Sequence, residues 1–458
     1  MAATEQETIA GFASLGGEVL FPETAGYDEA RRVHNGLVDK HPAAIARCRG
    51  MADVVEAVNT ARELGLEISV RGGGHAISGT AVTEGGLMID LSQMKGIHVD
   101  VARATARAQP GVLWGEVNRE TQLHGLAVTG GVVSSTGIAG LTLGGGIGWL
   151  MPSIGLATDN LLSVDVVIAD GRVLVASADS HPDLFWALRG GGGNFGIVTS
   201  FEYRLHRIGP IVTGGVVVHP FAAAAGLLRF FRDFSRDIPD ELMIIAALLH
   251  APDGSGMPVA AIGVGHVGPP EEADRDLAPL LGFGAPLDVQ VGPMPYSVLN
   301  TLFDASYPAG ALNHWKSAFL RDLSDEAIDD VVTRFAACPS PMSLIAIEHF
   351  HGAVTRVPVD ATAMPHRETG FNLLITSVWT DPDSTAANVA WTRESFNGLD
   401  RFVVDRRYVN YLDADDTGDA AASSAFGRNY ERLGEIKRVY DPENVFHLNT
   451  NVKPADGS

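Results

Sequence analysis

The chain has 458 residues, long enough to fold around more than one hydrophobic core, and 46% of them are hydrophobic, as in a water-soluble globular protein. Its net charge of −22 would repel phosphate backbones and anionic lipids, so we expect no nucleic-acid and no membrane partner. No apolar run approaches the roughly 20 residues that a membrane-spanning helix requires.

The N-terminal part of the chain alternates short helices with short strands. The opening MAATEQETIA lacks the basic and apolar regions of a signal peptide, which predicts a cytoplasmic protein. Residues 51–65 place apolar side chains on one helical face and end in glycine, which predicts an amphipathic helix. Further predictions are strands at 67–71 and 86–91, a helix at 112–125, and a hairpin turning on Asp170 and Gly171.

Glycine clusters become rarer after about residue 208. Strand-like runs such as MIIAALLH and SLIAIEHFHGA alternate with helix-like runs such as DEAIDDVVTRFAA, which predicts an antiparallel sheet backed by helices. The last stretch reads as a strand over RRYVNYLD, a helix and a polar tail. Cys48 and Cys338 stand in no CxxC or metal-binding pattern, so we expect two free thiols and no metal site.

Three glycine clusters lie in the first part, at 71–75, 140–148 and 189–196. The third satisfies GxGxxG, but the helix-like HPDLFWALR precedes it and the strand-like IVTSFEYRL follows it. A dinucleotide fingerprint has the opposite order, strand before and helix after, so a Rossmann site is not expected. Three such loops in one unit instead predict backbone N–H groups that bind a pyrophosphate.

Four stretches, in this order along the chain, resemble one protein family. They are VRGGGHAISG with LMIDLSQMKGI, GVVSSTGIAGLTLGGGIGWL, DLFWALRGGGGNFGIVTSF, and YVNYLD with NYERLGEIKRVYDPENVF. They are similar to the vanillyl-alcohol-oxidase type of FAD-binding oxidoreductases, within its berberine-bridge-enzyme-like branch. The chain length and the C-terminal ending are also similar to those of the bacterial 6-hydroxy-D-nicotine oxidases.

The resemblance implies an α+β fold in three segments. Residues 1–208 would form a PCMH-type FAD-binding domain of two α/β subdomains. Residues 209–401 would form a substrate-binding domain with an antiparallel sheet backed by helices, and residues 402–458 would return to the FAD domain.

The resemblance also implies a covalently bound cofactor. In the family, the histidine of the RxGGH segment is joined to the 8α-methyl carbon of FAD, and His75 matches it. The glycines before His75 leave few side chains to pack against it, as a loop lying on the edge of a flavin requires. Relatives with a second bond, from a cysteine to flavin C6, have that cysteine where this chain has Val133. We therefore expect attachment through His75 alone.

The other FAD contacts carry over by motif. The first loop would wrap the pyrophosphate and ring edge, and residues 137–141 would continue along the isoalloxazine. Residues 197–198 would meet the adenine side, and Asn449 or Asn451 would close the site from the C-terminus. Ile138 lies where the branch admits or blocks oxygen, which leaves oxidase and dehydrogenase chemistry both open. The expected set is Arg71, Gly72, Gly73, Gly74, His75, Ala76, Ile77, Gly137, Ile138, Ala139, Gly140, Leu141, Ile147, Ile197, Val198, Asn449 and Asn451.

Hydride transfer to a flavin also requires a base that takes a proton from the substrate. In the branch this base is a tyrosine of a Tyr-x-Asn-Tyr element, which implies Tyr411, with Tyr408 three positions earlier. A free tyrosine titrates near pH ~10, so a cationic neighbour is needed, and Arg406 or Arg407 is the candidate.

The run SLIAIEHFHGAV supplies the other candidates for catalysis. Strand alternation places His349 and His351 on one face and Glu348 on the opposite face. Two histidines without a third ligand make a poor zinc site. Two interpretations remain open: both groups polarise the substrate, or they lie on a solvated face of the strand. Glu348 replaces them if the other face meets the cofactor.

These features predict an FAD-dependent oxidase that takes a hydride from a CH–OH group of a sugar, polyketide or other secondary metabolite, with molecular oxygen as acceptor and hydrogen peroxide as product. Two alternatives remain open: an amine or heterocycle oxidase of the 6-hydroxynicotine oxidase type, and a catalytically silent flavin-binding protein. A sugar site should be an open groove, whereas an amine site should be closed and apolar. Both a monomer and a homodimer fit the sequence.

Overall fold

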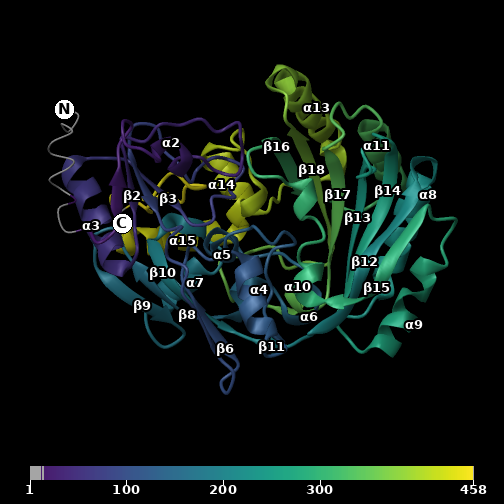
Figure 1. Ribbon diagram of the computed structural model, residues 1–458, viewed down its shortest axis with the longest axis horizontal. Helices are drawn as coiled ribbons and strands as arrows, with labels where there is room; N and C mark the ends of the chain where they lie inside the picture. Colours follow the sequence, from purple (N-terminus) through teal and green to yellow (C-terminus); the bar gives the residue numbers. More distant parts are fainter. Residues whose placement is uncertain (1–11, 13–14, 457–458) are drawn as a thin grey trace.

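The computed structural model describes residue 12 and residues 15–456. Two regions, each built around β-sheets, lie side by side (Figure 1). We call residues 15–208 with 402–456 the first region and residues 209–401 the second region. Among the described residues, no helix combines the length and the apolar character needed to cross a membrane.

The first region contains two main sheets. The smaller has the order β1 (Glu18–Leu20), β2 (Ala44–Arg47), β4 (Leu87–Asp90), β3 (Ile68–Arg71), and its last three strands are parallel. The larger is antiparallel, in the order β5 (Ile97–Asp100), β6 (Thr105–Ala108), β10 (Ile197–Arg204), β8 (Leu161–Val167), β9 (Val173–Ser177). The short strands β7 (Leu126–Ala127) and β11 (His206–Arg207) pair separately.

Short helices connect these strands. The predicted helix after β2 is α3 (Met51–Leu64), and Gly65 ends it with a φ of 65°. The others are α2 (Tyr27–Ala30), α4 (Trp114–Gln122), α5 (Ile138–Leu143), α6 (Met151–Ile154) and α7 (Pro182–Leu188). The third glycine cluster follows α7 and precedes β10, which confirms the order that speaks against a Rossmann site.

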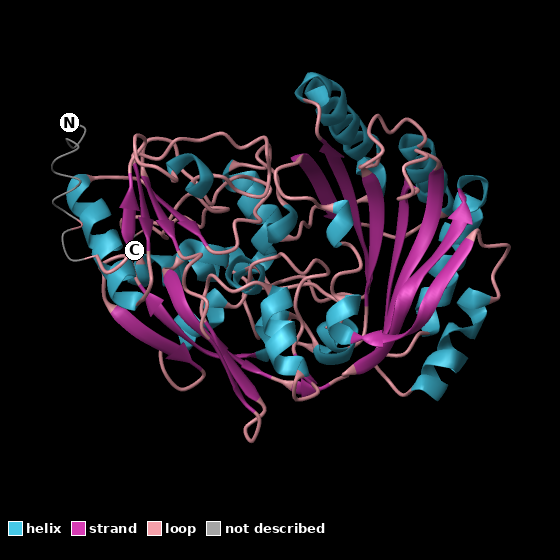
Figure 2. Cartoon of the chain, in the orientation of Figure 1, coloured by secondary structure: helices cyan, strands magenta, loops and turns pink. Residues whose placement is uncertain are grey.

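The second region is one seven-stranded antiparallel sheet with helices on one face (Figure 2). Its order is β15 (Asp288–Pro295), β12 (Ile211–Pro220), β14 (Pro258–His266), β13 (Leu242–His250), β17 (Leu344–Phe350), β18 (Gly370–Trp379), β16 (Leu312–Phe319). Four helices cover its outer face: α8 (Ala224–Phe234), α9 (Pro270–Leu281), α11 (Asp325–Phe335) and α13 (Thr385–Gly398). The inner face packs against the first region, where Met243 and Trp315 share a core with Ile77 and Trp149. Two short helices, α10 (Tyr296–Leu299) and α12 (Ala353–Arg356), complete the region.

The C-terminal segment leaves the second region and packs on the first. Helices α14 (Gly418–Phe426) and α15 (Tyr430–Tyr440) place Phe426 and Leu433 in the core that contains β8 and β10. The expected α+β class and the helix-backed antiparallel sheet are confirmed. The exact segment boundaries, 1–208, 209–401 and 402–458, remain predictions.

The predicted strand over RRYVNYLD is wrong. Residues Val409–Tyr411 form a single 3₁₀ turn, and Arg406 and Arg407 precede it without strand pairing. The turn points the two tyrosines of YVNY in different directions, and their rings meet edge to face with centroids 4.9 Å apart. Strand alternation therefore cannot be used to decide which side chains lie on the same side of the backbone as Tyr408.

Candidate active site at the interface of the two regions

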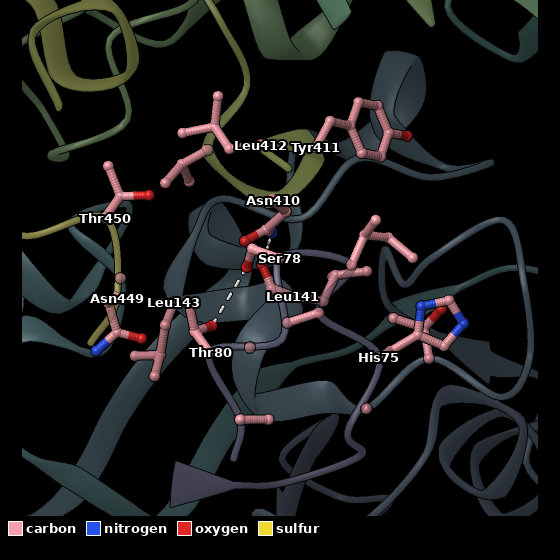
Figure 3. A pocket seen from close by; sticks show the side chains of 18 of the residues that line it. His75, Ser78, Thr80, Leu141, Leu143, Asn410, Tyr411, Leu412, Asn449 and Thr450 are labelled. Carbon is pink, nitrogen blue, oxygen red and sulfur yellow. Dashed lines mark hydrogen bonds between the residues drawn. The ribbon is translucent and has the colours of Figure 1, made fainter. Parts of the chain in front are cut away.

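A cavity of about 720 Å³ extends from the loops of the first region to the inner face of the seven-stranded sheet. Residues of all three glycine clusters line it, together with side chains of β13 and β17 and the C-terminal residues 446–451. In Figure 3, His75 and Tyr411 lie toward one end of the view, and Asn449 and Thr450 lie toward the other. Of the residues expected at the site, the cavity is lined by Gly72, Gly73, Gly74, His75, Ala76, Ile77, Gly137, Ala139, Gly140, Leu141, Ile147, Ile197, Val198, Tyr408, Tyr411, Asn449 and Asn451.

Close backbone packing explains why glycine is needed at Gly73 in the first cluster and at Gly137, just before the second. A Cβ atom on Gly73 would lie 2.5 Å from the Cα of Gly137, which begins the turn into α5. A Cβ on Gly137 would in turn lie 2.6 Å from the nitrogen of Gly73. These glycines let the His75 loop rest directly on the start of α5, with backbone exposed to the cavity.

His75 faces the cavity as a neutral imidazole. Burial, with a smaller contribution from His34, lowers the pKa of His75 to about 3. The two imidazole rings stack with centroids 3.9 Å apart and an interplanar angle of 19°. The Nε2 atom of His75 is buried and has no hydrogen-bond partner in the described chain. His75 lines the cavity, and its uncharged imidazole fits a bond to a cofactor there.

Two expected cofactor contacts lie outside the cavity. The Arg71 guanidinium turns away and donates a 2.6 Å hydrogen bond to the Ala30 carbonyl. Ile138 is fully buried in the core of the first region. The sequence could not separate these two from their neighbours, because a motif assigns whole segments and not side-chain directions.

The C-terminal tail is fixed to the third glycine cluster by hydrogen bonds. Asn194 donates from Nδ2 to the Thr450 carbonyl at 3.0 Å and accepts at Oδ1 from the Val452 N–H at 3.1 Å. A Cβ on Gly193 would lie 3.0 Å from the amide of Asn449, so this glycine also sits where the tail approaches closely. The tail thereby closes the cavity end opposite His75.

A carboxylate and a phenol meet at the sheet end of the cavity. The Tyr411 hydroxyl donates to Glu348 Oε1 at 2.9 Å, and the Asn372 amide donates to Glu348 Oε2 at 2.8 Å. Burial raises the pKa of Glu348, and these two hydrogen bonds oppose that rise. Burial, followed by the Glu348 charge, raises the pKa of Tyr411 well above its ordinary value.

Neither predicted arginine contacts these tyrosines. Arg406 pairs with Glu368 at 2.6 Å, and Arg407 pairs with Asp416. The expectation that one of them lowers the pKa of a tyrosine is therefore wrong. The polar partner of Tyr411 is Glu348, a residue that the chain order places 63 positions away.

His349 and His351 lie on the face of β17 that points away from the cavity. Their rings stack at 4.5 Å, His349 contacts Phe371, and His351 lies 3.4 Å from the Pro239 carbonyl. The predicted alternation of side chains is correct. Because Glu348 is the residue on the inner, cavity-lining face, the two histidines are on the other side, and substrate polarisation by them does not fit the structure.

Apolar and aromatic residues form most of the wall around Glu348. Phe303, Tyr307 and Trp315 line it beside aliphatic residues of three neighbouring strands. The sequence does not reveal this wall, because the strand that carries Trp315, β16, also carries the buried polar residues His314 and Lys316. The aliphatic members are Ile245, Ala247, Leu249, Leu344, Ala346 and Leu374.

His314, Asp413 and Asp415 lie close enough together to offer three ligand atoms to a metal ion. Cationic side chains already pair with Asp415. Arg393 makes two 2.7 Å hydrogen bonds to Asp415, and Lys316 lies 3.7 Å from the same residue. The cluster is thus an internal charge network beside the cavity.

Comparison with known proteins agrees with this geometry. Residues 42–177 match the family model of an FAD binding domain, and residues 407–453 match the model "Berberine and berberine like". The chain is 33% identical to (R)-6-hydroxynicotine oxidase of Paenarthrobacter nicotinovorans over 96% of this chain and 97% of that protein. It is 31% identical to an FAD-linked oxidoreductase of Dictyostelium discoideum, over 90% and 89%.

Solved structures extend the same likeness. The crystal structure of 6-hydroxy-D-nicotine oxidase from Arthrobacter nicotinovorans superimposes with a TM-score of 0.88 at 30% identity, covering 96% of this chain and 99% of that one. Glucooligosaccharide oxidase from Acremonium strictum gives a TM-score of 0.88 at 28% identity, covering 98% and 100%. The glycine loops, the neutral His75 imidazole and the cavity fit the FAD that is named for the glucooligosaccharide oxidase. The chain is an FAD-dependent oxidoreductase and belongs to the berberine-bridge-enzyme-like family.

Proposed function

We propose that this enzyme oxidises a CH–OH group of an apolar, ring-containing substrate, with Tyr411 and Glu348 as the groups that take up the proton. The observation that carries the proposal is the 2.9 Å hydrogen bond from Tyr411 to Glu348 in the same cavity as His75. FAD, when bound, accepts the hydride that leaves the substrate carbon. The protein residues must supply everything else.

The proton would move through the pair in one direction. The Tyr411 oxygen takes the proton of the substrate hydroxyl while its own proton passes to the Glu348 carboxylate, so both groups stay paired throughout. The Asn372 amide holds the second carboxylate oxygen and fixes its orientation. A carboxylate whose pKa burial raises is a better proton acceptor than an ordinary one, which suits this role.

The experiment that tests this pair is Tyr411→Phe. We expect the rate of flavin reduction by a substrate to fall by about 10²–10⁴, the usual contribution of general base catalysis, with the flavin spectrum unchanged. Ser306→Ala, a change at another cavity residue with a hydroxyl, is the matched control and should stay within a few-fold of wild type. Full turnover in Tyr411→Phe would contradict the assignment.

The apolar wall favours a compact ring over an oligosaccharide. An open groove with polar rims is expected for a sugar, whereas Phe303, Trp315 and the aliphatic side chains enclose the space beside Glu348. We therefore place polyketide-like and other apolar alcohols before sugars. Specificity would come from the Glu348 carboxylate and the Tyr411 hydroxyl beside these apolar surfaces.

An amine substrate is the second candidate. The enclosed apolar wall is what we expect of an amine site, and the surroundings of Glu348 also favour it. Among the described residues, Glu348 has two neutral hydrogen-bond donors and no cationic partner, so a substrate ammonium would supply the missing charge. The chain is also similar over nearly its whole length to a 6-hydroxynicotine oxidase.

A panel of matched cyclic alcohols and amines, monitored by flavin bleaching, separates the two. Faster bleaching by the alcohols supports the first proposal, and faster bleaching by the amines supports the second. No bleaching by either series would instead support a flavin-binding protein without oxidase activity. Release of hydrogen peroxide in the same assay tests our proposal that molecular oxygen is the electron acceptor.

We also propose that His75 holds FAD covalently at the 8α position and that no second bond exists. The glucooligosaccharide oxidase named above carries a 6-S-cysteinyl, 8α-N1-histidyl FAD. Here Val133, which lines the cavity, offers no nucleophile for a bond to flavin C6.

Acid precipitation tests the covalent bond directly. The wild-type pellet should keep its yellow colour, whereas the His75→Ala pellet should be colourless, with FAD in the supernatant. A colourless wild-type pellet would overturn the covalent bond. A pellet that stays yellow in His75→Ala would show a second attachment. Mass analysis of the flavin peptide provides the matching positive identification.

A further inference from the structure

Tyr408 has a hydroxyl oxygen whose accepting positions are already occupied. The Gly146 N–H donates to it at 2.9 Å and the Asn410 amide at 2.8 Å, while the Ile147 N–H lies at 3.4 Å. The orientation of the Asn410 amide is fixed, because its Nδ2 also donates to the Leu141 carbonyl at 3.1 Å (Figure 3). A phenol oxygen that accepts from several N–H groups has only its own proton left to offer.

That proton lacks an acceptor within the described chain. Burial raises the pKa of Tyr408 to about 12, so the hydroxyl keeps its proton at neutral pH. Among the hydrogen bonds of residue 12 and residues 15–456, the Tyr408 hydroxyl donates none. Tyr408 is 1% exposed and lines the cavity. A buried donor without an acceptor is costly, and because Tyr408 lines the cavity, an occupant of the cavity can supply the acceptor.

We propose that the Tyr408 hydroxyl donates a hydrogen bond to a carbonyl oxygen or ring nitrogen of the bound isoalloxazine and thereby raises its reduction potential. Reduction places negative charge on the ring, so a donor stabilises the reduced form more than the oxidised form. The N–H groups of Gly146 and Asn410 polarise the Tyr408 hydroxyl and make it a stronger donor. Tyr408 and Tyr411 thus have separate tasks, the first toward the cofactor and the second toward the substrate.

The inference depends on FAD in this cavity, and it is independent of the substrate and of the His75 bond. The test is the midpoint potential of the bound flavin, measured by titration with a reference dye, in wild type and in Tyr408→Phe. Loss of the donor should shift the equilibrium about tenfold toward the oxidised form, which is about 30 mV for a two-electron couple. The flavin absorption bands should shift as well.

Tyr296→Phe is the matched control. Tyr296 is also fully buried with its hydroxyl unpaired, but it does not line the cavity, so its removal should leave the potential unchanged. An unchanged potential in Tyr408→Phe would overturn the proposal. An unchanged potential with weaker substrate binding would assign the Tyr408 proton to the substrate instead.

A second replacement keeps the proposal testable if Tyr408→Phe does not fold or does not bind FAD. Fluorotyrosine at position 408 retains the hydroxyl and makes it more acidic, so it should donate more strongly and raise the potential above that of wild type. A potential equal to or below that of wild type would contradict a hydrogen bond from Tyr408 to the flavin. Turnover is not needed for either readout, so failure here is distinct from failure of the Tyr411 assignment.

Discussion

At the scale of single residues, Glu348 combines a cost to stability with a proposed role in catalysis. Glu348 is 2% exposed, and in the part of the chain that the structure describes its carboxylate is paired with an amide and a phenol and with no cation. Burial raises the pKa of Glu348, so folding favours the neutral acid. The stability from this group is complete below the pKa of an unfolded glutamate and is lost as the pH rises through the folded pKa.

Glu348→Gln should therefore make the protein more stable at neutral pH while it slows turnover. The amide cannot ionise, so the variant escapes the loss that wild type suffers as the pH rises, and the two should converge in acid below about pH 4. Flavin reduction should slow by about 10²-fold or more because the proton acceptor is gone. Urea midpoints across pH give the first result and stopped-flow reduction the second.

Glu368→Gln provides the comparison, since Glu368 is 70% exposed and pairs with Arg406 at the surface. This change should leave the urea midpoint and the reduction rate nearly unaltered. If Glu348→Gln were less stable than wild type at neutral pH, the buried carboxylate would be stabilising, and our account of its burial would fail.

The choice between Glu348 and His349 shows what the sequence could establish and what it could not. Alternation correctly placed them on opposite faces of one strand. Every residue of β17 is buried, however, because helices cover one face and the first region covers the other. A strand buried on both faces has no polar side to reveal which direction leads to the cofactor. The cavity face could be identified only from the packing.

At the scale of elements, hydrophobic periodicity predicted those helices and strands whose partners are apolar. The amphipathic α3, the hairpin of β8 and β9, and the run of β17 are examples. It missed β16, because His314 and Lys316 are buried there against acidic residues about 100 positions later. It also made YVNY a strand, because a 3₁₀ turn held by Tyr408 hydrogen bonds to a distant loop has no local signal.

The outer face of β17 carries a histidine pair that should make the protein sensitive to acid. Burial, with a contribution from His351, lowers the pKa of His349 from 6.5 to about 3. The stability that depends on its neutral form is complete above pH 6.5 and is lost as the pH falls toward 3, since only the unfolded chain then binds the proton. The loss is about 1.4 kcal/mol per pH unit.

His349→Phe should therefore flatten the dependence of unfolding free energy on pH below neutrality, by about 2 kcal/mol at pH ~5. Phenylalanine keeps the ring that packs on Phe371, and turnover at neutral pH should not change. His98→Phe, at an exposed position of β5, should leave the slope as in wild type. If the folded His349→Phe protein turned over slowly, His349 would have a role in polarising the substrate, as the sequence suggested, and our account would be wrong.

At the scale of the whole molecule, one cavity depends on segments that lie far apart in the chain. The first two glycine clusters, the third cluster with the C-terminal tail, and the inner face of the sheet each supply part of the lining. The family resemblance located the motifs at both ends of the chain. It could not show how the tail is secured, because the stretch NYERLGEIKRVYDPENVF contains Lys437 and Asp441 but does not reveal that their side chains form a buried ion pair.

Lys437 and Asp441 form this ion pair, and both side chains are completely buried. Lys437 Nζ donates to Asp441 Oδ2 at 2.6 Å, to the Asn194 carbonyl at 2.6 Å and to the Phe446 carbonyl at 2.9 Å. It thereby connects α15, the third glycine cluster and the start of the tail. Burial lowers the pKa of Lys437, and the Asp441 charge opposes that shift.

Lys437→Met should destabilise the protein by about 3–5 kcal/mol, because it leaves the Asp441 charge buried without a partner. It should also weaken FAD binding, measured in a His75→Ala background where the cofactor is free to dissociate, since the tail lines the cavity.

The double variant Lys437→Met with Asp441→Asn removes both charges and should recover part of the stability. Lys453→Met, also in the tail, breaks the exposed pair with Asp419 of α14. It should change the free energy of unfolding, measured in urea, by less than about 1 kcal/mol. If Lys437→Met proved no worse than Lys453→Met, the buried pair would not be what secures the tail against the glycine loop, and the hydrogen bonds of Asn194 would have to hold the closed cavity on their own.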